Sequence, residues 1–512
     1  MNIFDALEHS KNRYPEKDAI WYGGVATTYA QLYDQVCWLS SALEQQNLHK
    51  GERVALFLPN GPDFLISYFA TVRLGAIAVS LNVMLKRDEV KFILNDCETM
   101  ILITCDRLLA QLPHVDETPA LKKILCVDES QHAGVIGIDK LLPRVRGSHT
   151  AASLAHDEGA AILYSSGTTG KPKGALLSHG NLVSNVAATV SHTGMSPNDQ
   201  LICFLPLFHC FGQNFIMNAS IACGATLVLH ERFQLDTILE SVRTDRISMF
   251  FGVPAVYSRL LSLTDIEERF RSVRYCFSAA APMPIPVARQ WRQRLGRPIY
   301  EGYGLTETSP FASYNHDVDY REGSVGTPIE NVDMKIVDPE GLELPVGEQG
   351  EIAIKGPNVM LGYFQRPEET AQVMRDGWFL SGDIGKRDHD GHFYLVDRAK
   401  DMINVSGFKV WPREVEELLL LHPSVSEAGV IGVADPISGE AVKAFVVLKQ
   451  GESISEHNLI DYARNRIAVY KAPRFVEFID ALPRNPAGKV LKRELRARGN
   501  MPESVSVSVR VA

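Results

Sequence analysis

The chain has 512 residues, of which 45% are hydrophobic and 22% charged, with a mean hydropathy of −0.05 and a net charge of −9. This length exceeds one ordinary hydrophobic core and predicts two or more domains. The acidic balance argues against nucleic acid as the main partner. Eight scattered cysteines without a Cys-x-x-Cys pair indicate neither a zinc site nor a disulfide framework, and with no signal peptide in view the expected compartment is the cytoplasm.

The N-terminal part alternates between predicted helices and predicted strands. Thr28 is the expected N-cap of a first long helix. Buried strands are expected at 54–58, 76–81 and 100–104, with helices at 63–74 and 88–95. The apolar stretch 64–85 contains Arg73 and Gly75, so it predicts a helix followed by a strand, not a membrane span. This alternation predicts mostly parallel sheets covered on both faces by helices.

A loop rich in glycine, hydroxyl and lysine side chains spans Tyr164 to Gly174, Tyr-Ser-Ser-Gly-Thr-Thr-Gly-Lys-Pro-Lys-Gly. Glycines let backbone N–H groups approach a ligand, and hydroxyls with lysines supply donors and charge for a polyphosphate. An apolar run at 160–164 predicts a strand before the loop, and 178–190 predicts a helix behind it; such an arrangement suits nucleotide phosphates. The spacing differs from the usual P-loop, because only two threonines separate the first two glycines.

Three later stretches are apolar or sterically small. Residues 205–212 place His209 among aromatic rings, a setting in which a histidine more often packs than reacts. The segments 250–254 and 278–282 either let backbone line a narrow cleft or form two strand ends in a core.

A further group of motifs predicts nucleotide contacts. In 300–308, Tyr-Glu-Gly-Tyr-Gly-Leu-Thr-Glu-Thr, an aromatic ring flanked by glycines can be exposed to stack on a base. Thr306 and Glu307 suit a phosphate and Mg²⁺, which takes oxygen ligands. Asp383 suits a ribose diol because a carboxylate accepts two hydrogen bonds, although a turn aspartate is the ordinary explanation. A hairpin turn is expected at 390–391, Asp-Gly.

The chain changes character after Lys400. Helices at 412–421 and 459–466, with strands at 430–433, 444–448 and 475–479, predict a small α+β domain. Near its end, the turn-rich loop 483–489 presents Lys489. The tail from 498 alternates serine and valine and is read as an added edge strand or a disordered end.

These motifs, in this order and at these spacings, resemble the acyl-adenylate-forming family, which includes acyl-CoA synthetases, firefly luciferase and the adenylation domains of peptide synthetases. The resemblance covers residues 1–496 and is carried jointly by 164–174, 301–308, 381–383, 397–409 and Lys489. Within this family the chain looks most like bacterial long-chain fatty-acid–CoA ligases, through 355–360, 396–398 and 407–416.

The resemblance implies an α/β fold in which a large domain of helix-covered, mostly parallel sheets, residues 1–399, binds ATP and the acid. It implies a hinge at Lys400, a mobile α+β lid domain at 401–496 and a tail at 497–512. It also implies two half-reactions. A carboxylate attacks the α-phosphate of ATP to give acyl-AMP and pyrophosphate, and the thiol of coenzyme A then takes the acyl group and releases AMP. A medium- to long-chain fatty acid is the substrate that it favours.

Carried over residue by residue, the resemblance implies catalytic roles for Thr306, Glu307, His209, the hinge Lys400 and Lys489, with Glu307 holding Mg²⁺. The ATP-binding set that it implies is Ser165, Ser166, Gly167, Thr168, Thr169, Lys173, Ala280, Glu301, Gly302, Tyr303, Thr306, Asp383, Arg398 and Lys489. The implied acyl-binding set is Phe208, His209, Phe211, Phe251, Val253, Ala279 and Ala280. Arg232, Ser406 and Gly407 match positions that meet coenzyme A in related ligases.

The chain departs from the family pattern at three places. Ala279 and Ala280 stand where fatty-acid ligases commonly carry Gly-Gly, which narrows the mouth of the acyl tunnel. No tryptophan stands near 208–212, where some long-chain members have one that gates the tunnel. Asn404 occupies a position where relatives often have a lysine for the thioester step. The first two departures leave chain length and branching open, and the third leaves the thiol acceptor open.

Several alternatives therefore stand beside the fatty-acid–CoA ligase. The acceptor is either coenzyme A or the phosphopantetheine arm of an acyl carrier protein. An aryl-acid–CoA ligase is another candidate, since the two alanines suit a shorter pocket. An inactive scaffold with this fold is disfavoured by the presence of Lys489, Glu307 and Asp383. The oligomeric state stays open, a homodimer included.

Overall fold

The structure, a computed structural model, describes residues 2–141, 152–165, 172–316, 318–398, 401–406, 408–435, 438–486 and 488–499. The α-helices in these residues are α1 (Ile3–Arg13), α2 (Tyr29–Gln45), α3 (Pro62–Arg73), α4 (Arg87–Asp96), α5 (His179–Thr193), α6 (Ala219–Cys223), α7 (Leu235–Thr244), α8 (Pro254–Leu261), α9 (Ile266–Arg269), α10 (Ile285–Leu295), α11 (Pro367–Val373), α12 (Pro412–Leu420), α13 (Glu456–Arg464) and α14 (Lys492–Gly499). Short 3₁₀ turns are η1 (Asp106–Gln111), η2 (Val115–Glu117), η3 (Ile138–Leu141) and η5 (Thr306–Thr308), and η4 (Phe211–Asn218) is a π-helix.

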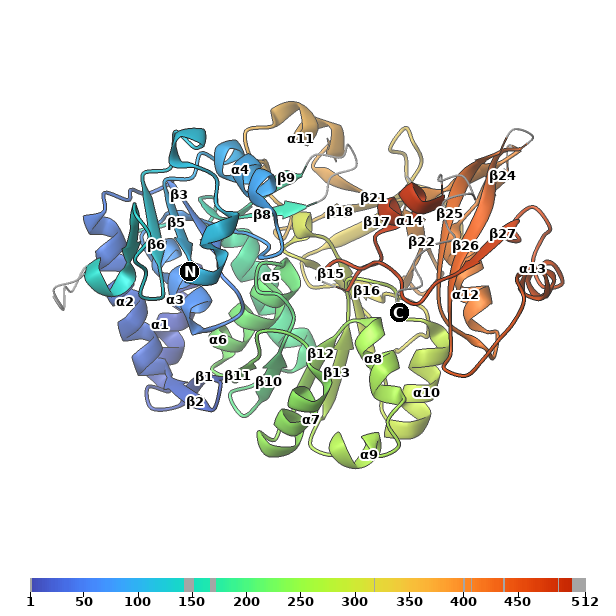
Figure 1. Cartoon of the computed structure of the whole chain (residues 1–512), viewed down its shortest axis with the longest axis horizontal. Coiled ribbons are helices and arrows are strands. Elements are labelled where there is room, and N and C mark those ends of the chain that lie inside the picture. The colour runs from blue at the N-terminus through green and yellow to red at the C-terminus, as the bar shows by residue number, and fades with distance from the viewer. Residues whose placement is uncertain are drawn as a thin grey trace, which may run out of the picture.

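The first large sheet runs through the middle of the molecule (Figure 1) in the strand order β16-β15-β14-β13-β12-β10-β11-β1-β2. Its pairings from β1 through β11, β10, β12 and β13 to β14 are parallel, and β15, β16 and β2 add antiparallel edges. The strands are β1 (Asp18–Tyr22), β2 (Val25–Thr28), β10 (Gln200–Cys203), β11 (Thr226–Leu229), β12 (Met249–Gly252), β13 (Tyr275–Ser278), β14 (Tyr300–Gly304), β15 (Phe311–Tyr314) and β16 (Thr327–Pro328).

The second large sheet has the order β19-β9-β8-β4-β3-β5-β6-β7 and is parallel from β8 to β7. The residues of β4 and β5 are buried throughout, which is the continuous apolar pattern of a sheet covered on both faces. The strands are β3 (Arg53–Phe57), β4 (Ile77–Ser80), β5 (Ile101–Thr104), β6 (Lys123–Cys126), β7 (Val135–Gly137), β8 (Gly159–Ser165), β9 (Lys173–Ser178) and β19 (Gly362–Tyr363).

Two antiparallel sheets follow. The first links β17, β18, β21 and β20 in that order, with β22 beside β21, and it carries the predicted turn at 390–391 between its last two strands. The second lies in the C-terminal part, in orange and red in Figure 1, in the order β24-β23-β26-β25 with β27 beside β26. The strands are β17 (Asp333–Val337), β18 (Gly350–Lys355), β20 (Met374–Arg375), β21 (Trp378–Arg387), β22 (Phe393–Arg398), β23 (Ile403–Val405), β24 (Phe408–Val410), β25 (Val425–Asp435), β26 (Gly439–Leu448) and β27 (Phe475–Phe478).

The C-terminal sheet has hydrophobic cores of its own. One is centred on Val415, Leu419 and Leu459, between the sheet and helices α12 and α13. Another packs Leu482 and Leu495 on the opposite face against Phe445. We call the described residues from 401 onward the lid. The α/β fold with a large N-terminal unit and a smaller α+β C-terminal unit is the fold class that the sequence predicted.

Local signals fixed several helix starts as predicted. The Thr28 hydroxyl accepts a hydrogen bond from the Gln31 N–H at 3.2 Å and begins α2. The stretch 64–85 forms α3 and then β4, and no helix in the described parts of the chain is long and apolar enough to cross a membrane. The helix predicted behind the phosphate loop is present as α5, but a short strand that was not predicted stands between the loop and this helix. The loop connects β8 to an antiparallel strand β9, and Ser178 caps α5 only after that strand.

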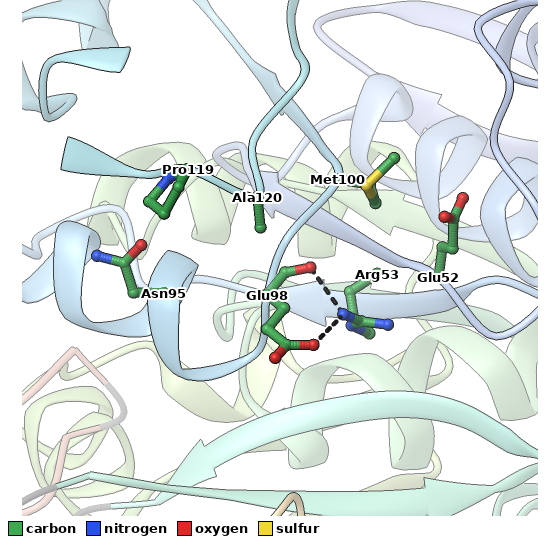
Figure 2. A pocket seen from close by; sticks show the side chains of 7 residues that line it. All are labelled: Glu52, Arg53, Asn95, Glu98, Met100, Pro119 and Ala120. Atoms are coloured by element: carbon green, nitrogen blue, oxygen red, sulfur yellow. Dashed lines mark hydrogen bonds and ion pairs between the residues drawn. The ribbon is translucent and has the colours of Figure 1, made fainter. Parts of the chain in front are cut away.

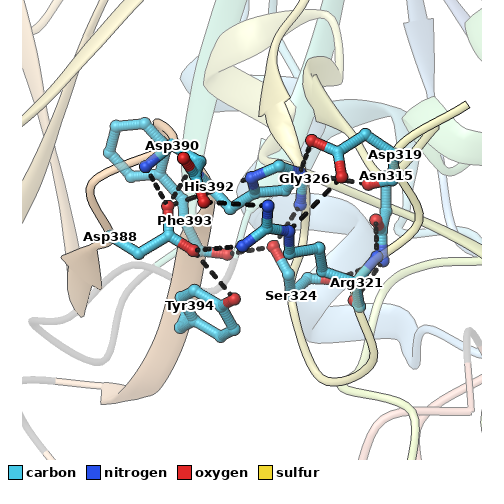
Figure 3. Close-up of polar contacts among 10 residues, drawn as sticks. All are labelled: Asn315, Asp319, Arg321, Ser324, Gly326, Asp388, Asp390, His392, Phe393 and Tyr394. Atoms are coloured by element: carbon cyan, nitrogen blue, oxygen red, sulfur yellow. Dashed lines mark hydrogen bonds and ion pairs between the residues drawn. The ribbon is translucent and has the colours of Figure 1, made fainter.

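A polar clasp joins the edge of the first sheet to the β21–β22 hairpin (Figure 3). The Arg321 guanidinium lies 2.9 Å from the Asp390 carboxylate and 3.6 Å from that of Asp388, in the hairpin turn. The Ser324 hydroxyl donates to the Phe393 carbonyl at 2.8 Å. The Phe393 N–H donates in turn to the Gly326 carbonyl at 2.8 Å, so the hairpin is held at a fixed distance from β15 and β16.

Gly326 is the point of closest backbone approach in this clasp. Its φ is +82°, and a Cβ built there would lie 1.8 Å from the Tyr314 carbonyl oxygen. We expect Gly326→Ala to lower the free energy of unfolding by about 2–4 kcal/mol, because both strain and a backbone clash oppose the side chain. Chemical denaturation measures this.

Gly347→Ala is the matched control. Gly347 also has a positive φ, +90°, but nothing lies within 4 Å of a Cβ built on it. That variant carries the conformational cost alone, about 1 kcal/mol. Equal losses in the two variants would contradict a clash at Gly326.

Candidate active site

The predicted site residues come together beyond the carboxyl ends of parallel strands. Ser165 ends β8, Val253 follows β12, Ala279 follows β13, and Tyr303 lies near the end of β14. Ligands of open α/β sheets bind at this edge, since the loops that follow the strands converge there. The site thus spans both large sheets.

The structure describes the two ends of the phosphate loop, up to Ser165 and from Pro172 onward. Ser165 and Lys173 are directly opposite each other in the β8–β9 ladder. Lys173 is only 6% exposed, and its ammonium lies 5.1 Å from the centre of the Tyr363 ring, a cation–π contact. The remaining loop residues predicted to bind phosphates, and two predicted residues farther along the chain, lie outside the described residues: Ser166, Gly167, Thr168, Thr169, Lys400 and Gly407.

Glu307 is buried on the short turn η5, next to the half-buried Thr306. Its Oε1 accepts two hydrogen bonds at 3.0 Å, from the Ser165 hydroxyl and from the Tyr363 hydroxyl. Its backbone carbonyl accepts from the Met360 N–H at 2.8 Å. Three segments therefore meet at Glu307: its own turn, the end of β8 and residues 360–363.

This donor set fits Mg²⁺. The cation takes oxygen ligands and keeps waters or substrate phosphates among them, so one carboxylate and one hydroxyl from the protein suffice. Among the residues that the structure describes, no group of three or more His, Cys, Asp and Glu side chains could hold a metal by itself. Glu307, with Thr306 beside it, would hold the ion, which neutralises phosphate charge when bound.

Asp383 is the second buried carboxylate of the site. Its Oδ2 accepts from the Tyr303 hydroxyl at 2.8 Å, and its Oδ1 lies 2.7 Å from Nε of Arg398. The three residues belong to β14, β21 and β22, so this contact ties the hairpin to the first sheet. A buried carboxylate that keeps its charge needs such partners.

Tyr303 differs from its prediction. The sequence indicated a ring exposed between glycines, whereas Tyr303 is 6% exposed and its hydroxyl is engaged by Asp383. The flanking glycines serve packing: a Cβ on Gly302 would lie 2.6 Å from Phe277, and one on Gly304 would lie 1.6 Å from the Pro310 carbonyl. Burial and the neighbouring Asp383 charge raise the pKa of Tyr303 well above its ordinary value, so the phenol stays protonated.

Glu301 lies two residues before Tyr303 and is also buried. Burial raises its pKa to about 8, against the opposing effect of the Arg413 charge in the lid. The Met283 N–H donates to its Oε2 at 3.4 Å. This carboxyl therefore keeps its proton at neutral pH and can donate a hydrogen bond as well as accept one.

The lid places its predicted lysine next to the large unit. Burial, together with the nearby Lys489 charge, lowers the pKa of His209 to about 4. The Phe211 N–H donates to Nδ1 of His209 at 3.3 Å, so the neutral ring carries its proton on Nε2. Gly488 has a φ of +81°, and a Cβ built on it would lie 2.7 Å from Val253, which shows how closely the lysine loop approaches the large unit.

An aromatic cluster extends from this point into the core. The Phe215 ring centre lies 4.7 Å from that of Phe277, 5.0 Å from Phe311 and 5.4 Å from Phe211. Phe251 joins at 6.1 Å. Of the predicted acyl-binding residues, Phe211 and Phe251 thus lie in one wall, while Phe208 and Ala279 are partly accessible. Phe215, Phe277 and Phe311 were not predicted; the i, i+4 spacing of Phe211 and Phe215 was the available signal.

The backbone conformation of Ala280 bears on one departure from the family pattern. Its φ is +68°, in the left-handed region that favours glycine. The side chain is exposed at the turn after β13. Alanine at this position carries a conformational cost of about 1 kcal/mol, because its Cβ crowds the following carbonyl. A glycine at this position, which the family resemblance implied, would not carry this cost.

Two of the predicted coenzyme A residues are described, and both are exposed. Arg232 is exposed on the turn after β11, and Ser406 is exposed between β23 and β24. In the described part of the chain, no hydrogen bond or ion pair joins one of these residues to the other. Their assignment stays a prediction.

A surface hollow of about 570 Å³ lies away from the site (Figure 2). It is lined by Glu52, Arg53, Asn95, Glu98, Met100, Pro119 and Ala120, at the amino ends of β3 and β5. The Arg53 guanidinium inside it donates to the Glu98 carboxylate at 3.0 Å and to the Cys97 carbonyl at 2.6 Å. Ligands of parallel sheets bind at the opposite edge, so this hollow does not compete with the site.

The sequence matches the AMP-binding enzyme family over residues 7–364 and the AMP-binding enzyme C-terminal domain over residues 414–489. A feruloyl-CoA synthase from Amycolatopsis sp is 36% identical over 498 residues, covering 94% of this chain and 96% of that protein. A long-chain-fatty-acid–CoA ligase from Bacillus subtilis (strain 168) is 35% identical over 524 residues, covering 96% and 93%. The crystal structure of the anthranilate CoA ligase AuaEII in complex with anthranoyl-AMP has a TM-score of 0.91 at 29% identity, covering 97% of each chain.

The fold, with its large N-terminal and smaller C-terminal units, is that of acyl-CoA ligases. The chain belongs to the AMP-binding enzyme family and is an AMP-forming acid–thiol ligase. Its relatives act on acids of different kinds, as their names state, so family membership leaves the acid open.

The Glu301 carboxyl generates a pH prediction. Its folded-state pKa of about 8 lies above the ordinary 4.5, so the folded chain holds the proton across that window while the unfolded chain loses it. This contribution to stability is complete below pH 4.5 and is lost as the pH rises through 8. The Glu301→Gln variant keeps the acceptor for the Met283 N–H. We expect its free energy of unfolding to rise relative to that of the parent by on the order of 2 kcal/mol between pH 5 and 8.

The measurement is urea denaturation of both proteins at several pH values. The expected result is a difference in free energy of unfolding that grows with pH in favour of the glutamine variant. A constant difference across the window would contradict a protonated Glu301.

Proposed function

We propose that this chain activates a medium- to long-chain fatty acid with ATP and transfers the acyl group to coenzyme A. The observation that carries the proposal is the neighbourhood of Lys489. The charge of Lys489 is near enough to lower the pKa of His209, and from His209 an apolar aromatic wall leads into the core. A carboxylate bound at Lys489 would have its tail against that wall.

The reaction proceeds in two steps. A carboxylate oxygen of the acid attacks the α-phosphorus of ATP, the bond to the β-phosphate oxygen breaks, and pyrophosphate leaves. The thiol of coenzyme A then attacks the acyl carbon, loses its proton, and AMP leaves with the electrons of the acyl–oxygen bond. Adenylation is needed because a free carboxylate is a poor electrophile. The protein's task is to neutralise charge and to position the reactants.

The described residues divide this task by charge. Lys173 and the loop after Ser165 would hold the β- and γ-phosphates, and Glu307 with Thr306 would hold Mg²⁺ at the α-phosphate. Asp383 and Arg398 would bind the ribose, with Glu301, Gly302, Tyr303 and Ala280 framing the adenine. Lys489 would bridge the carboxylate and the α-phosphate oxygen. Support comes from the convergence of these side chains at one edge of the two sheets.

The second step calls for a different lid position. Lys489 would leave the site as the lid turns about Lys400, at the boundary proposed between residues 1–399 and 401–496. Arg232, Ser406 and Gly407 would then bind coenzyme A. The contact of Gly488 with Val253 supports the first position, in which the lysine loop is seated on the large unit.

An aryl acid is the second candidate substrate. Five phenylalanine rings, centred on Phe215, pack against one another behind His209. Such a wall suits the flat ring of a short acid as well as it suits an alkyl chain. The Amycolatopsis relative bears the name feruloyl-CoA synthase, which favours keeping this candidate.

Lys489→Ala tests the assignment of the bridging lysine. We expect acyl-AMP formation, measured by ATP–pyrophosphate exchange, to fall by about 10²–10³, since one preorganised donor to the developing charge is lost. Thioester formation from synthetic acyl-AMP and coenzyme A should stay within about two-fold of the parent. Lys449→Ala, on an exposed turn of the lid, is the control. Equal loss in both half-reactions would count against two lid positions.

The identity of the preferred acid is tested by measuring kcat/KM for saturated acids from butyrate to palmitate, and for benzoate and ferulate. Each methylene buried against the wall adds about 0.8 kcal/mol, or about four-fold, until the tail meets the wall's end. We expect Phe215→Ala to move the optimum towards longer acids. Phe270→Ala, which removes a buried ring packed on Phe250, should lower stability without moving the optimum. A parent that prefers aryl acids over every aliphatic one would overturn the fatty-acid proposal.

A further inference from the structure

Tyr363 contacts both charged side chains at the phosphate end of the site. Its hydroxyl lies 3.0 Å from Oε1 of Glu307, and its ring centre lies 5.1 Å from the ammonium of Lys173. The Ser165 hydroxyl lies 3.0 Å from the same Oε1. Neither the sequence motifs nor the proposed roles above include Tyr363.

The segment that carries Tyr363 is held at both ends. Strand β19 pairs with β9, and the Phe364 N–H donates to the Gly174 carbonyl at 2.8 Å. On the other side, the Met360 N–H donates to the Glu307 carbonyl at 2.8 Å. Gly362 allows this course, because a Cβ built on it would lie 2.9 Å from Thr370. The backbone around Tyr363 is thus bonded both to the strand that carries Lys173 and to Glu307, the two residues that the Tyr363 side chain contacts.

The two hydroxyls leave the two carboxylate oxygens of Glu307 unequal. An ionised carboxylate only accepts hydrogen bonds, so Ser165 and Tyr363 both act as donors to Oε1. None of the described residues donates a hydrogen bond to Oε2. Hydrogen bonds of this kind orient the carboxylates that bind metals, and removing one typically costs about 10–100-fold in metal affinity.

We propose that Tyr363 is a positioning residue that commits Oε1 of Glu307 to hydroxyl donors, so that the divalent cation accompanying ATP binds through Oε2 alone. The inference rests on the proposed function, in which Glu307 holds that cation. Binding through one oxygen suits Mg²⁺, which demands near-ideal octahedral geometry. When Oε1 loses one of its two donors it is freer to contact the cation as well, and binding through both oxygens is a mode that Ca²⁺ accepts more readily.

Tyr363→Phe removes the hydroxyl and keeps the ring beside Lys173. The test measures Mn²⁺ binding in the presence of ATP and the absence of any acid, from the electron paramagnetic resonance signal of free Mn²⁺. We expect the Kd for Mn²⁺ to rise by about 10-fold or more. Competition should show a shift in the ratio of Mg²⁺ to Ca²⁺ affinities towards Ca²⁺. The Kd for ATP in EDTA should stay unchanged, because the ring contact with Lys173 remains.

Two further variants separate the alternatives. Tyr363→Leu also removes the ring, so ATP binding in EDTA should weaken as well. Tyr33→Phe is the matched control, because the Tyr33 hydroxyl donates to the Glu8 carboxylate at 2.9 Å far from the site in sequence. That variant should bind Mn²⁺ as the parent does.

The outcomes separate this inference from the function on which it rests. An unchanged Kd for Mn²⁺ in Tyr363→Phe, with normal binding by the parent, would overturn the role of Tyr363 alone. An equal weakening with and without metal would also overturn it, since the hydroxyl would then act on the nucleotide. A parent that binds no Mn²⁺ with ATP would overturn the metal role of Glu307 and the inference together.

Discussion

The buried carboxylate of Asp383 is the constraint on which the arrangement of the site depends. Water is excluded from it, so its charge requires partners, and it takes them from two directions: Tyr303 on β14 and Arg398 on β22. These contacts fix the hairpin against the first sheet, and the clasp around Arg321 holds the far end of the same hairpin. Arg398 is the last residue of β22, so this contact lies next to the hinge proposed at Lys400.

At the end of the site proposed to bind phosphates, the positive charge of Lys173 and the negative charge of Glu307 contact hydroxyl and aromatic groups instead of each other. Lys173 is buried against the ring of Tyr363, and Glu307 receives two hydroxyls on one oxygen. Such contacts preorganise a cation and an anion without pairing them, which keeps both available to a charged ligand. Neutral groups surround the position proposed for the acid instead: burial lowers the pKa of His209 and raises that of Cys210 to about 12.

Much of the fold could be predicted from the sequence because its signals are local. The N-cap at Thr28, the apolar runs of β3, β4 and β8, and the hairpin turn at 390–391 each depend on neighbours within a few residues. The chemistry of the site was also predictable, since glycine, hydroxyl, lysine and carboxylate side chains stand in ordered motifs. Family membership follows from those motifs taken together.

The sequence by itself determined most element types, the fold class and the residue types on which the proposed nucleotide site depends. Only the tertiary structure decided which contacts these residues make. Strand β9 was missed, because a short strand after a loop is stabilised by pairing with β8 and β19. Tyr303 was expected exposed, and its burial follows from packing against distant segments. Tyr363 carried no local signal, since its partners Glu307 and Lys173 lie far away along the chain and meet it only when the sheets pair.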